Sequence, residues 1–141
     1  MRVFVDTWGW LTLEDHKETK HEEVATLVRE SLKRPGLLVT SDHVLDEVIT
    51  RLFRRRPFEE SWLFTEGLLK SAGRGSVVLE RVNEERFEDA IALRKTLSDK
   101  PRISFTDLTS MVIMRELKIL TVVTADEHFR QAGLGFRLLP D

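Results

Sequence analysis

Five short apolar runs, rich in β-branched residues, recur along this chain and constrain its fold more than any other feature. They lie at residues 2–5, 37–40, 76–79, 119–123 and 136–139. Each run is apolar at successive positions, so both faces of the strand it forms would be covered, as is typical of parallel sheets. The runs therefore predict a buried parallel sheet.

Helical patterns separate these runs. Apolar residues recur at helical spacing from Val24 to Leu32, before a stop at Pro35-Gly36. Further helices are predicted at 42–56, 58–72, 82–98, 104–117 and about 127–132. Strands that alternate with helices through right-handed crossovers predict a three-layer α/β/α sandwich. The length of 141 residues suits one compact core, so we expect residues 1–141 to form a single domain.

The composition excludes several classes of protein. A net charge of -2 is not that of a protein that coats nucleic acid by charge alone. The absence of cysteine excludes disulfide frameworks and thiolate metal sites. No apolar run approaches the roughly 18–20 residues of a membrane span, and the first residues lack the apolar core of a signal peptide. We therefore expect a soluble cytoplasmic protein.

Four acidic residues are the candidate functional groups: Asp6, Glu47, Asp107 and Asp126. Asp6 and Asp126 follow apolar strand-like runs, and parallel sheets bind ligands beyond the carboxyl ends of their strands. Glu47 and Asp107 lie on predicted helices, and the helix of Asp107 is apolar nearly all round. Burying an unpaired carboxylate costs several kcal/mol, so Asp107 needs a partner from elsewhere in the fold.

Each acid also has an ordinary structural explanation. Asp6 can cap a following helix, and Glu47 can face solvent and pair with Arg51 one turn on. Asp107 can complete a capping box begun by Ser104, although aspartate is short for that role. For Asp126, we expect Thr124 and Glu127 to form the capping box of the last helix, so that Asp126 is not needed there; its charge can still favour the helix dipole.

Together, the four acids are better explained by a bound cation. Carboxylates offer hard oxygen ligands, which suit Mg²⁺ or Mn²⁺. Such a site can polarise a phosphoryl oxygen and activate water. We therefore predict that Asp6, Glu47, Asp107 and Asp126 are the metal ligands of a catalytic site.

Four segments of the chain carry a resemblance to a known family. The segments that carry it are VDTWGW at 5–10, TSDHVLDEVITRL at 40–52, ISFTDLTSMVIMRE at 103–116 and TADEHFRQAG at 124–133. With these segments, in this order, the chain resembles a PIN domain, in particular the toxin ribonucleases of VapC-type toxin–antitoxin pairs.

The resemblance implies a five-stranded parallel sheet ordered 3-2-1-4-5 and Mg²⁺- or Mn²⁺-dependent cleavage of RNA. It places the acidic site on the same four residues and gives a supporting hydroxyl role to Thr7, Ser104 or Thr124. It also implies a homodimer and a small antitoxin whose tail lies over the active-site groove. This chain has Glu127 and His128 where some relatives have a further acid, so the number of metals is left open. A surface or capping role is expected for His128, ahead of a ligand or general-acid role.

Two further groups of residues have competing interpretations. Arg51, Arg54, Arg55 and Arg56 either end a solvated helix or bind RNA phosphates near the acids. Most large aromatic residues of the first and middle helices are expected in the core, and some at a dimer or antitoxin interface. These are Trp8, Trp10, Phe53, Phe58, Trp62 and Phe64.

Other functions remain as alternatives. A housekeeping PIN-type nuclease in RNA processing would share all four acids, and a non-catalytic RNA- or protein-binding module would share the architecture. Receiver domains need a pair of acids after the first strand and an aspartate after the third, which SVVLERVN does not provide. Haloacid-dehalogenase-like phosphatases need Asp-x-Asp, where this chain has Asp-Thr-Trp.

Overall fold

The computed structural model describes residues 1–141 and contains one five-stranded sheet. Its strands are β1 (Val3–Val5), β2 (Leu38–Ser41), β3 (Val77–Glu80), β4 (Thr121–Val123) and β5 (Arg137–Leu139). All neighbouring pairs are parallel, in the order β3-β2-β1-β4-β5. The predicted strands and the sheet order implied by the family resemblance are both confirmed.

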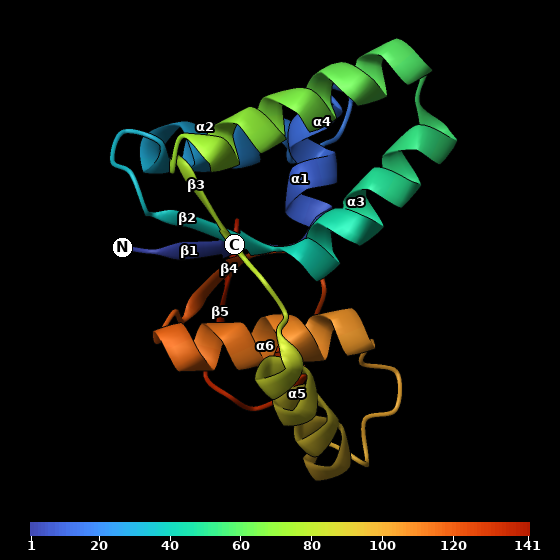
Figure 1. Ribbon diagram of the computed structural model, residues 1–141, viewed down its shortest axis with the longest axis vertical. Helices are drawn as coiled ribbons and strands as arrows, with labels where there is room; N and C mark the ends of the chain where they lie inside the picture. The colour runs from blue at the N-terminus through green and yellow to red at the C-terminus, as the bar shows by residue number, and fades with distance from the viewer.

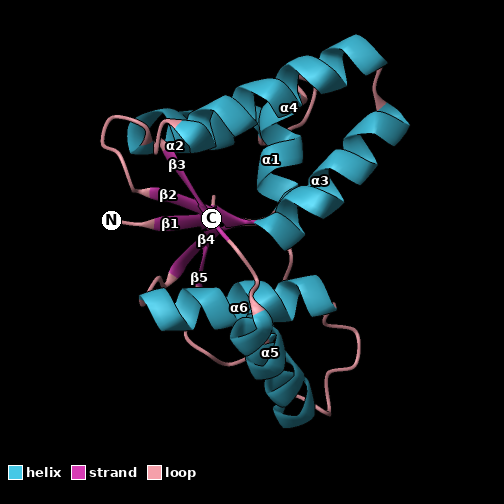
Figure 2. Ribbon diagram, viewed as in Figure 1, coloured by secondary structure: helices cyan, strands magenta, loops and turns pink.

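Helices cover the sheet on two sides. On one side of the strands, Figure 1 shows α1 (Thr7–Glu14), α2 (His21–Ser31), α3 (Asp42–Arg55) and α4 (Phe58–Gly73). On the other side lie α5 (Glu84–Thr96) and α6 (Phe105–Leu117). The short α7 (His128–Gln131) lies between β4 and β5 in the chain. The colouring by secondary structure in Figure 2 makes the same layers visible, which are those of the predicted α/β/α sandwich.

Local sequence signals explain where the helices begin. The Ser41 hydroxyl accepts a hydrogen bond from the backbone N–H of Val44 and starts α3, and Pro57 separates α3 from α4. In the same way the Asn83 side chain starts α5 and the Ser104 hydroxyl starts α6. Helix α6 ends at Lys118, whose φ of 58° is left-handed.

The core lies between the sheet and the inner faces of the helices. Helix α6 is buried continuously from Asp107 to Met114, as its apolar sequence predicts. Gly9 allows α1 to approach the sheet, because a Cβ atom there would lie 2.8 Å from Val5 Cγ1 and 3.0 Å from the Val123 backbone oxygen. This close contact sets the position of α1 over the carboxyl ends of β1 and β4.

The expectation that most aromatic residues of these helices are buried is only partly correct. Trp10 is buried, and its indole N–H donates to the Thr40 hydroxyl. Phe58 and Trp62 of α4 are 64% and 48% exposed, and their rings stack with centroids 6.4 Å apart. No helix in the structure has the length and apolar character needed to cross a membrane.

Candidate metal centre

A cleft of about 370 Å³ opens at the carboxyl ends of β1 and β4 and brings the four predicted acids together. Asp6 follows β1 and Asp126 follows β4, while Glu47 projects from α3 and Asp107 from the first turn of α6. The complete lining consists of Asp6, Thr7, Trp8, Glu47, Arg51, Arg102, Ser104, Asp107, Ala125, Asp126 and His128. Four segments that are distant in the sequence thus supply one acidic surface.

Asp6 is the most deeply buried of the four acids, with 4% of its surface exposed. Its Oδ2 accepts a hydrogen bond of 2.9 Å from the Thr124 hydroxyl, whereas its Oδ1 is buried without a partner. Asp6 occupies the N-cap position of α1, but its side chain makes no capping hydrogen bond. Burial raises the pKa of Asp6 to about 6, despite hydrogen bonds that favour the charged form.

Glu47 is half-buried and faces the cleft. Its Oε1 accepts a hydrogen bond from the hydroxyl of Thr7, which lies in the first turn of α1. Arg51 lines the same cleft but makes no ion pair with Glu47, so the alternative of a solvent-facing helical pair is wrong. Thr7 instead links α1 to α3 at the rim of the site.

Asp107 is buried, and no lysine or arginine side chain pairs with it. Its backbone N–H donates to the Ser104 hydroxyl at 3.1 Å, so Ser104 caps α6 as expected. Burial, followed by the negative charges of Asp6 and Asp126, raises the pKa of Asp107 to about 9. Desolvation and the repulsion between neighbouring carboxylates therefore both disfavour the charged forms of Asp6 and Asp107.

The predicted capping box of Thr124 and Glu127 is wrong. Thr124 is 2% exposed, and its hydroxyl donates to Asp6 and accepts from the Asp126 backbone N–H at 3.0 Å. Asp126 itself supports the start of α7, because its Oδ1 accepts from the His128 backbone N–H at 2.9 Å. Because Thr124 directly follows β4, its hydroxyl bonds to Asp6 and does not form a capping box with Glu127.

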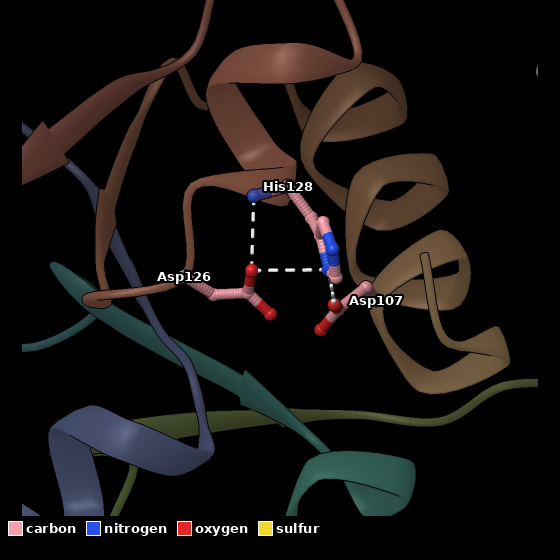
Figure 3. A group of neighbouring side chains, drawn as sticks. All are labelled: Asp107, Asp126 and His128. Carbon is pink, nitrogen blue, oxygen red and sulfur yellow. Dashed lines mark hydrogen bonds and ion pairs between the residues drawn. The ribbon is translucent and has the colours of Figure 1, made fainter. Parts of the chain in front are cut away.

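His128 belongs to the site more closely than the sequence predicts. Figure 3 shows its imidazole directed toward the carboxylates of Asp107 and Asp126. Its Nδ1 lies 3.1 Å from Asp126 Oδ1 and 3.7 Å from Asp107 Oδ2, so a surface role is wrong. The only sequence signal was its place two residues after Asp126, at the first turn of a short helix.

The four candidate RNA-binding arginines separate into distinct environments. Arg51 lines the acidic cleft together with Arg102, and it also lines a neighbouring cleft against α1, where Arg55 and Arg56 lie. Arg56 is paired with Glu14 at 3.2 Å and with Glu60 at 2.7 Å, which gives it a structural role. Arg54 lines neither cleft. Of the four, Arg51 is best placed to meet a phosphate at the acids.

Arg94 does not line the cleft but stabilises the loop that precedes α6, a role that no sequence pattern indicated. From α5, its guanidinium donates to three backbone oxygens of the loop that leads into α6. The acceptors are those of Leu97 at 2.7 Å, Lys100 at 2.6 Å and Ile103 at 2.7 Å. The loop held in this way carries Arg102 and Ser104 into the cleft.

The donor set fits a divalent cation with a preference for oxygen ligands. Four carboxylates line one cleft, and the buried Asp6 Oδ1 lacks any hydrogen-bond partner. One oxygen each from Asp107 and Asp126, with a nitrogen of His128, lie within 4.8 Å of one another. A cation would compensate the desolvation and mutual repulsion that raise the pKa values of Asp6 and Asp107.

Comparisons with known proteins agree with this geometry. A sequence model described as PIN domain matches residues 3–134. The 23S rRNA-specific endonuclease VapC20 of Mycobacterium tuberculosis is 29% identical over 131 residues, covering 93% of this chain and 94% of the relative. The VapC ribonuclease of Archaeoglobus fulgidus is 27% identical over 137 residues, covering 96% of this chain and 83% of the relative.

Solved structures show the same relationship. The crystal structure of Mycobacterium tuberculosis VapC20, described as a sarcin-ricin loop cleaving toxin, has a TM-score of 0.75 and 28% identity, covering 93% of this chain and 95% of that one. DNA-bound VapBC from Salmonella typhimurium has a TM-score of 0.70 with 16% identity, covering 98% and 96%, a likeness that concerns the fold alone.

Proposed function

Because this chain belongs to the PIN domain family, we propose that it is a metal-dependent endoribonuclease and the toxin of a toxin–antitoxin pair. The observation that carries the proposal is the convergence of Asp6, Glu47, Asp107 and Asp126 in one cleft beyond the sheet. The names of the VapC relatives, an endonuclease and a ribonuclease, support the same activity.

In this proposal Asp6, Glu47, Asp107 and Asp126 hold Mg²⁺ or Mn²⁺. The bound cation supplies Lewis-acid polarisation of the phosphodiester and activation of water. Two observations support this assignment: Asp6 Oδ1 has no hydrogen-bond partner, and no lysine or arginine forms an ion pair with Asp107.

Three hydroxyl groups give the acids fixed orientations. Thr124 donates to Asp6, and Thr7 donates to Glu47, so each carboxylate keeps one oxygen engaged and directs the other elsewhere. Ser104 acts through the backbone, because its bond to the N–H of Asp107 fixes the first turn of α6. These are positioning residues in the proposed reaction.

RNA would enter the acidic cleft beside the arginine side chains that line it. Arg51 and Arg102 line the acidic cleft and can bind phosphates on either side of the scissile bond, since arginine forms paired hydrogen bonds with phosphate oxygens. Because the chain as a whole has a net charge of -2, attraction of the polyanionic RNA depends on these two arginines and on the bound metal. Because VapC20 is named for 23S rRNA, ribosomal RNA is the first substrate to test.

A small antitoxin and a homodimer are the proposed partners. Exposed apolar side chains on α4 support a protein partner. On α4, Phe58, Trp62 and Leu63 are 64%, 48% and 72% exposed, so three large apolar side chains of one helix are open to solvent. Aromatic residues are enriched at the centres of protein interfaces, so this surface suits a partner chain.

Cleavage assays with a matched pair of variants test the proposed activity. Wild type, Asp107→Asn and the surface control Asp89→Asn, purified identically, are incubated with ribosomal RNA fragments and Mn²⁺, with and without EDTA. We expect cleavage by wild type and Asp89→Asn, and none by Asp107→Asn or with EDTA. Equal cleavage by all three proteins, or cleavage that persists in EDTA, would contradict a carboxylate–metal nuclease. Cleavage without growth arrest on expression would favour a processing nuclease over a toxin.

A further inference from the structure

The imidazole of His128 occupies a position that a hydrogen-bonding role does not explain. Its Nδ1 is buried and has no hydrogen-bond partner of acceptable geometry, although two carboxylates lie close by. A second buried atom without a partner, Oδ1 of Asp6, belongs to the lining of the same cleft. Two buried polar atoms without partners in one cleft indicate that something absent from the polypeptide completes their coordination.

The distances around Nδ1 match those between ligands of one cation. Two ligands at right angles, each about 2.1 Å from an octahedral cation, are about 3 Å apart, and opposite ligands are about 4.2 Å apart. Nδ1 of His128 lies 3.1 Å from Asp126 Oδ1 and 3.7 Å from Asp107 Oδ2, within that interval. Figure 3 shows the three side chains converging on a common space, Asp126 from the loop after β4, Asp107 from α6 and His128 from α7.

Local structure holds the imidazole in this place. The Asp126 carboxylate accepts from the backbone N–H of His128, so the carboxylate and the ring leave the chain within one short turn. Phe129, the next residue, is fully buried and packs against Phe136 with ring centroids 6.1 Å apart, which anchors α7 to the core. His128 is thus preorganised rather than free to turn toward solvent.

We propose that His128 is a nitrogen ligand of the cation held between Asp107 and Asp126, and that it makes this site prefer Mn²⁺ to Mg²⁺. The proposal rests on the proposed function for the presence of the cation, and adds a ligand and a selectivity to it. Imidazole suits transition metals, whereas Mg²⁺ favours oxygen ligands and retains its waters. An all-carboxylate site would discriminate less between the two ions.

Pulsed electron paramagnetic resonance of the Mn²⁺-loaded protein tests the ligand directly. We expect nitrogen modulation from a directly bound imidazole in wild type, and its replacement by the ¹⁵N pattern when the protein contains ¹⁵N-labelled histidine. This measurement needs no variant and does not depend on catalysis. A wild-type spectrum with no change on histidine labelling would overturn the proposal.

A pair of histidine variants tests the selectivity. His128→Asn places a hard amide oxygen near the position of Nδ1, and His16→Asn changes an exposed histidine outside the cleft. We expect His128→Asn to weaken Mn²⁺ binding by about tenfold or more, to change Mg²⁺ binding less, and to lose the nitrogen modulation. His16→Asn should match wild type. Equal loss of affinity for both ions in His128→Asn would contradict the proposed selectivity.

These readouts separate the inference from the nuclease assignment. Nitrogen-coordinated Mn²⁺ in a protein that cleaves no RNA would support His128 as a ligand and contradict the proposed function. RNA cleavage that requires Asp107, in a protein whose Mn²⁺ has no imidazole nitrogen, would support the function and overturn the inference. Circular dichroism of each variant confirms that the fold is kept.

Discussion

The hydroxyl of Thr124 donates a hydrogen bond of 2.9 Å to Asp6 Oδ2 and joins the ends of two neighbouring strands across the candidate metal centre. The same hydroxyl accepts from the backbone N–H of Asp126. A single buried side chain therefore sets the orientation of one acid and the backbone position of another. Residues of this kind tune metal sites without touching the metal.

Thr124→Val should impair metal binding more than it impairs folding. Valine has the same shape but cannot donate to Asp6 or accept from Asp126, so we expect Mn²⁺ affinity to fall by roughly 10–100-fold. Thr124→Ser keeps the hydroxyl and should recover most of that affinity. Isothermal titration calorimetry with Mn²⁺ measures both. Equal affinities for the valine and serine variants would contradict a role for the hydroxyl.

The metal-free protein should lose stability as pH rises. The pKa of Asp6 is raised from 3.8 to about 6, and that of Asp107 from 3.8 to about 9. Between 3.8 and its raised pKa, each group keeps in the folded state a proton that it has released in the unfolded state. The free energy of unfolding therefore falls from about pH 4 upward, because each pKa unit corresponds to about 1.4 kcal/mol. Urea unfolding in EDTA at pH 5 and pH 8 measures the change.

Asp107→Asn isolates the larger contribution. Asparagine does not ionise, so the metal-free variant should be more stable than wild type at pH 8 by about 1.4 kcal/mol or more, with the difference shrinking toward pH 4. Added Mn²⁺ should stabilise wild type at pH 8 and leave the variant nearly unchanged. A variant less stable than wild type at pH 8 in EDTA would show that the buried carboxyl is already compensated.

Two arginines on the same helix provide a test of RNA binding. Arg51 lines the acidic cleft and Arg54 does not. We expect Arg51→Gln to raise KM several-fold and to reduce the slope of log affinity against log salt by about 0.7–0.9, as for the loss of one phosphate contact. Arg54→Gln should leave both unchanged. Equal effects of the two substitutions would indicate general charge attraction instead of a defined contact.

Two helical glycines should respond to alanine in opposite directions. At Gly9 a Cβ atom would lie within 2.8 Å of Val5 and 3.0 Å of Val123, so Gly9→Ala should lower the free energy of unfolding by about 1–3 kcal/mol. At Gly67 of α4 nothing lies within 4 Å, so Gly67→Ala should raise it by up to about 1 kcal/mol through helix propensity. Thermal unfolding of both variants decides whether α1 is as closely packed as described.

Much of the fold followed from local patterns in the sequence. Strands β1, β2 and β4 are buried along their whole length, as their apolar runs predict. Ser41 and Ser104 start helices that the chain's periodicity already indicates. The four acids were identifiable because Asp6 and Asp126 end strands, and because Asp107 lies on an apolar helix without a neighbouring cation. Burial and backbone hydrogen bonding govern these features, and both leave local signals.

Other features depended on contacts between distant segments. The capping role of Thr124 was mispredicted because its hydroxyl is held by Asp6, which lies 118 residues earlier. The direction of the His128 ring is set by the docking of α7, and Arg94 finds its carbonyl partners only after α5 and α6 pack together. The exposure of Phe58 and Trp62 reflects how far α4 extends from the sheet, which residue type alone does not indicate.

The central place of β1 in the sheet has a consequence for when the molecule can act. Its neighbours β2 and β4 lie on opposite sides of it in the sheet, and both come later in the chain. The acidic cleft therefore exists only after the pairing of β1 with β4 closes a loop of more than a hundred residues. Such long-range pairing is slow compared with helix formation. Nascent chains and proteolytic fragments that lack either strand therefore carry no complete site.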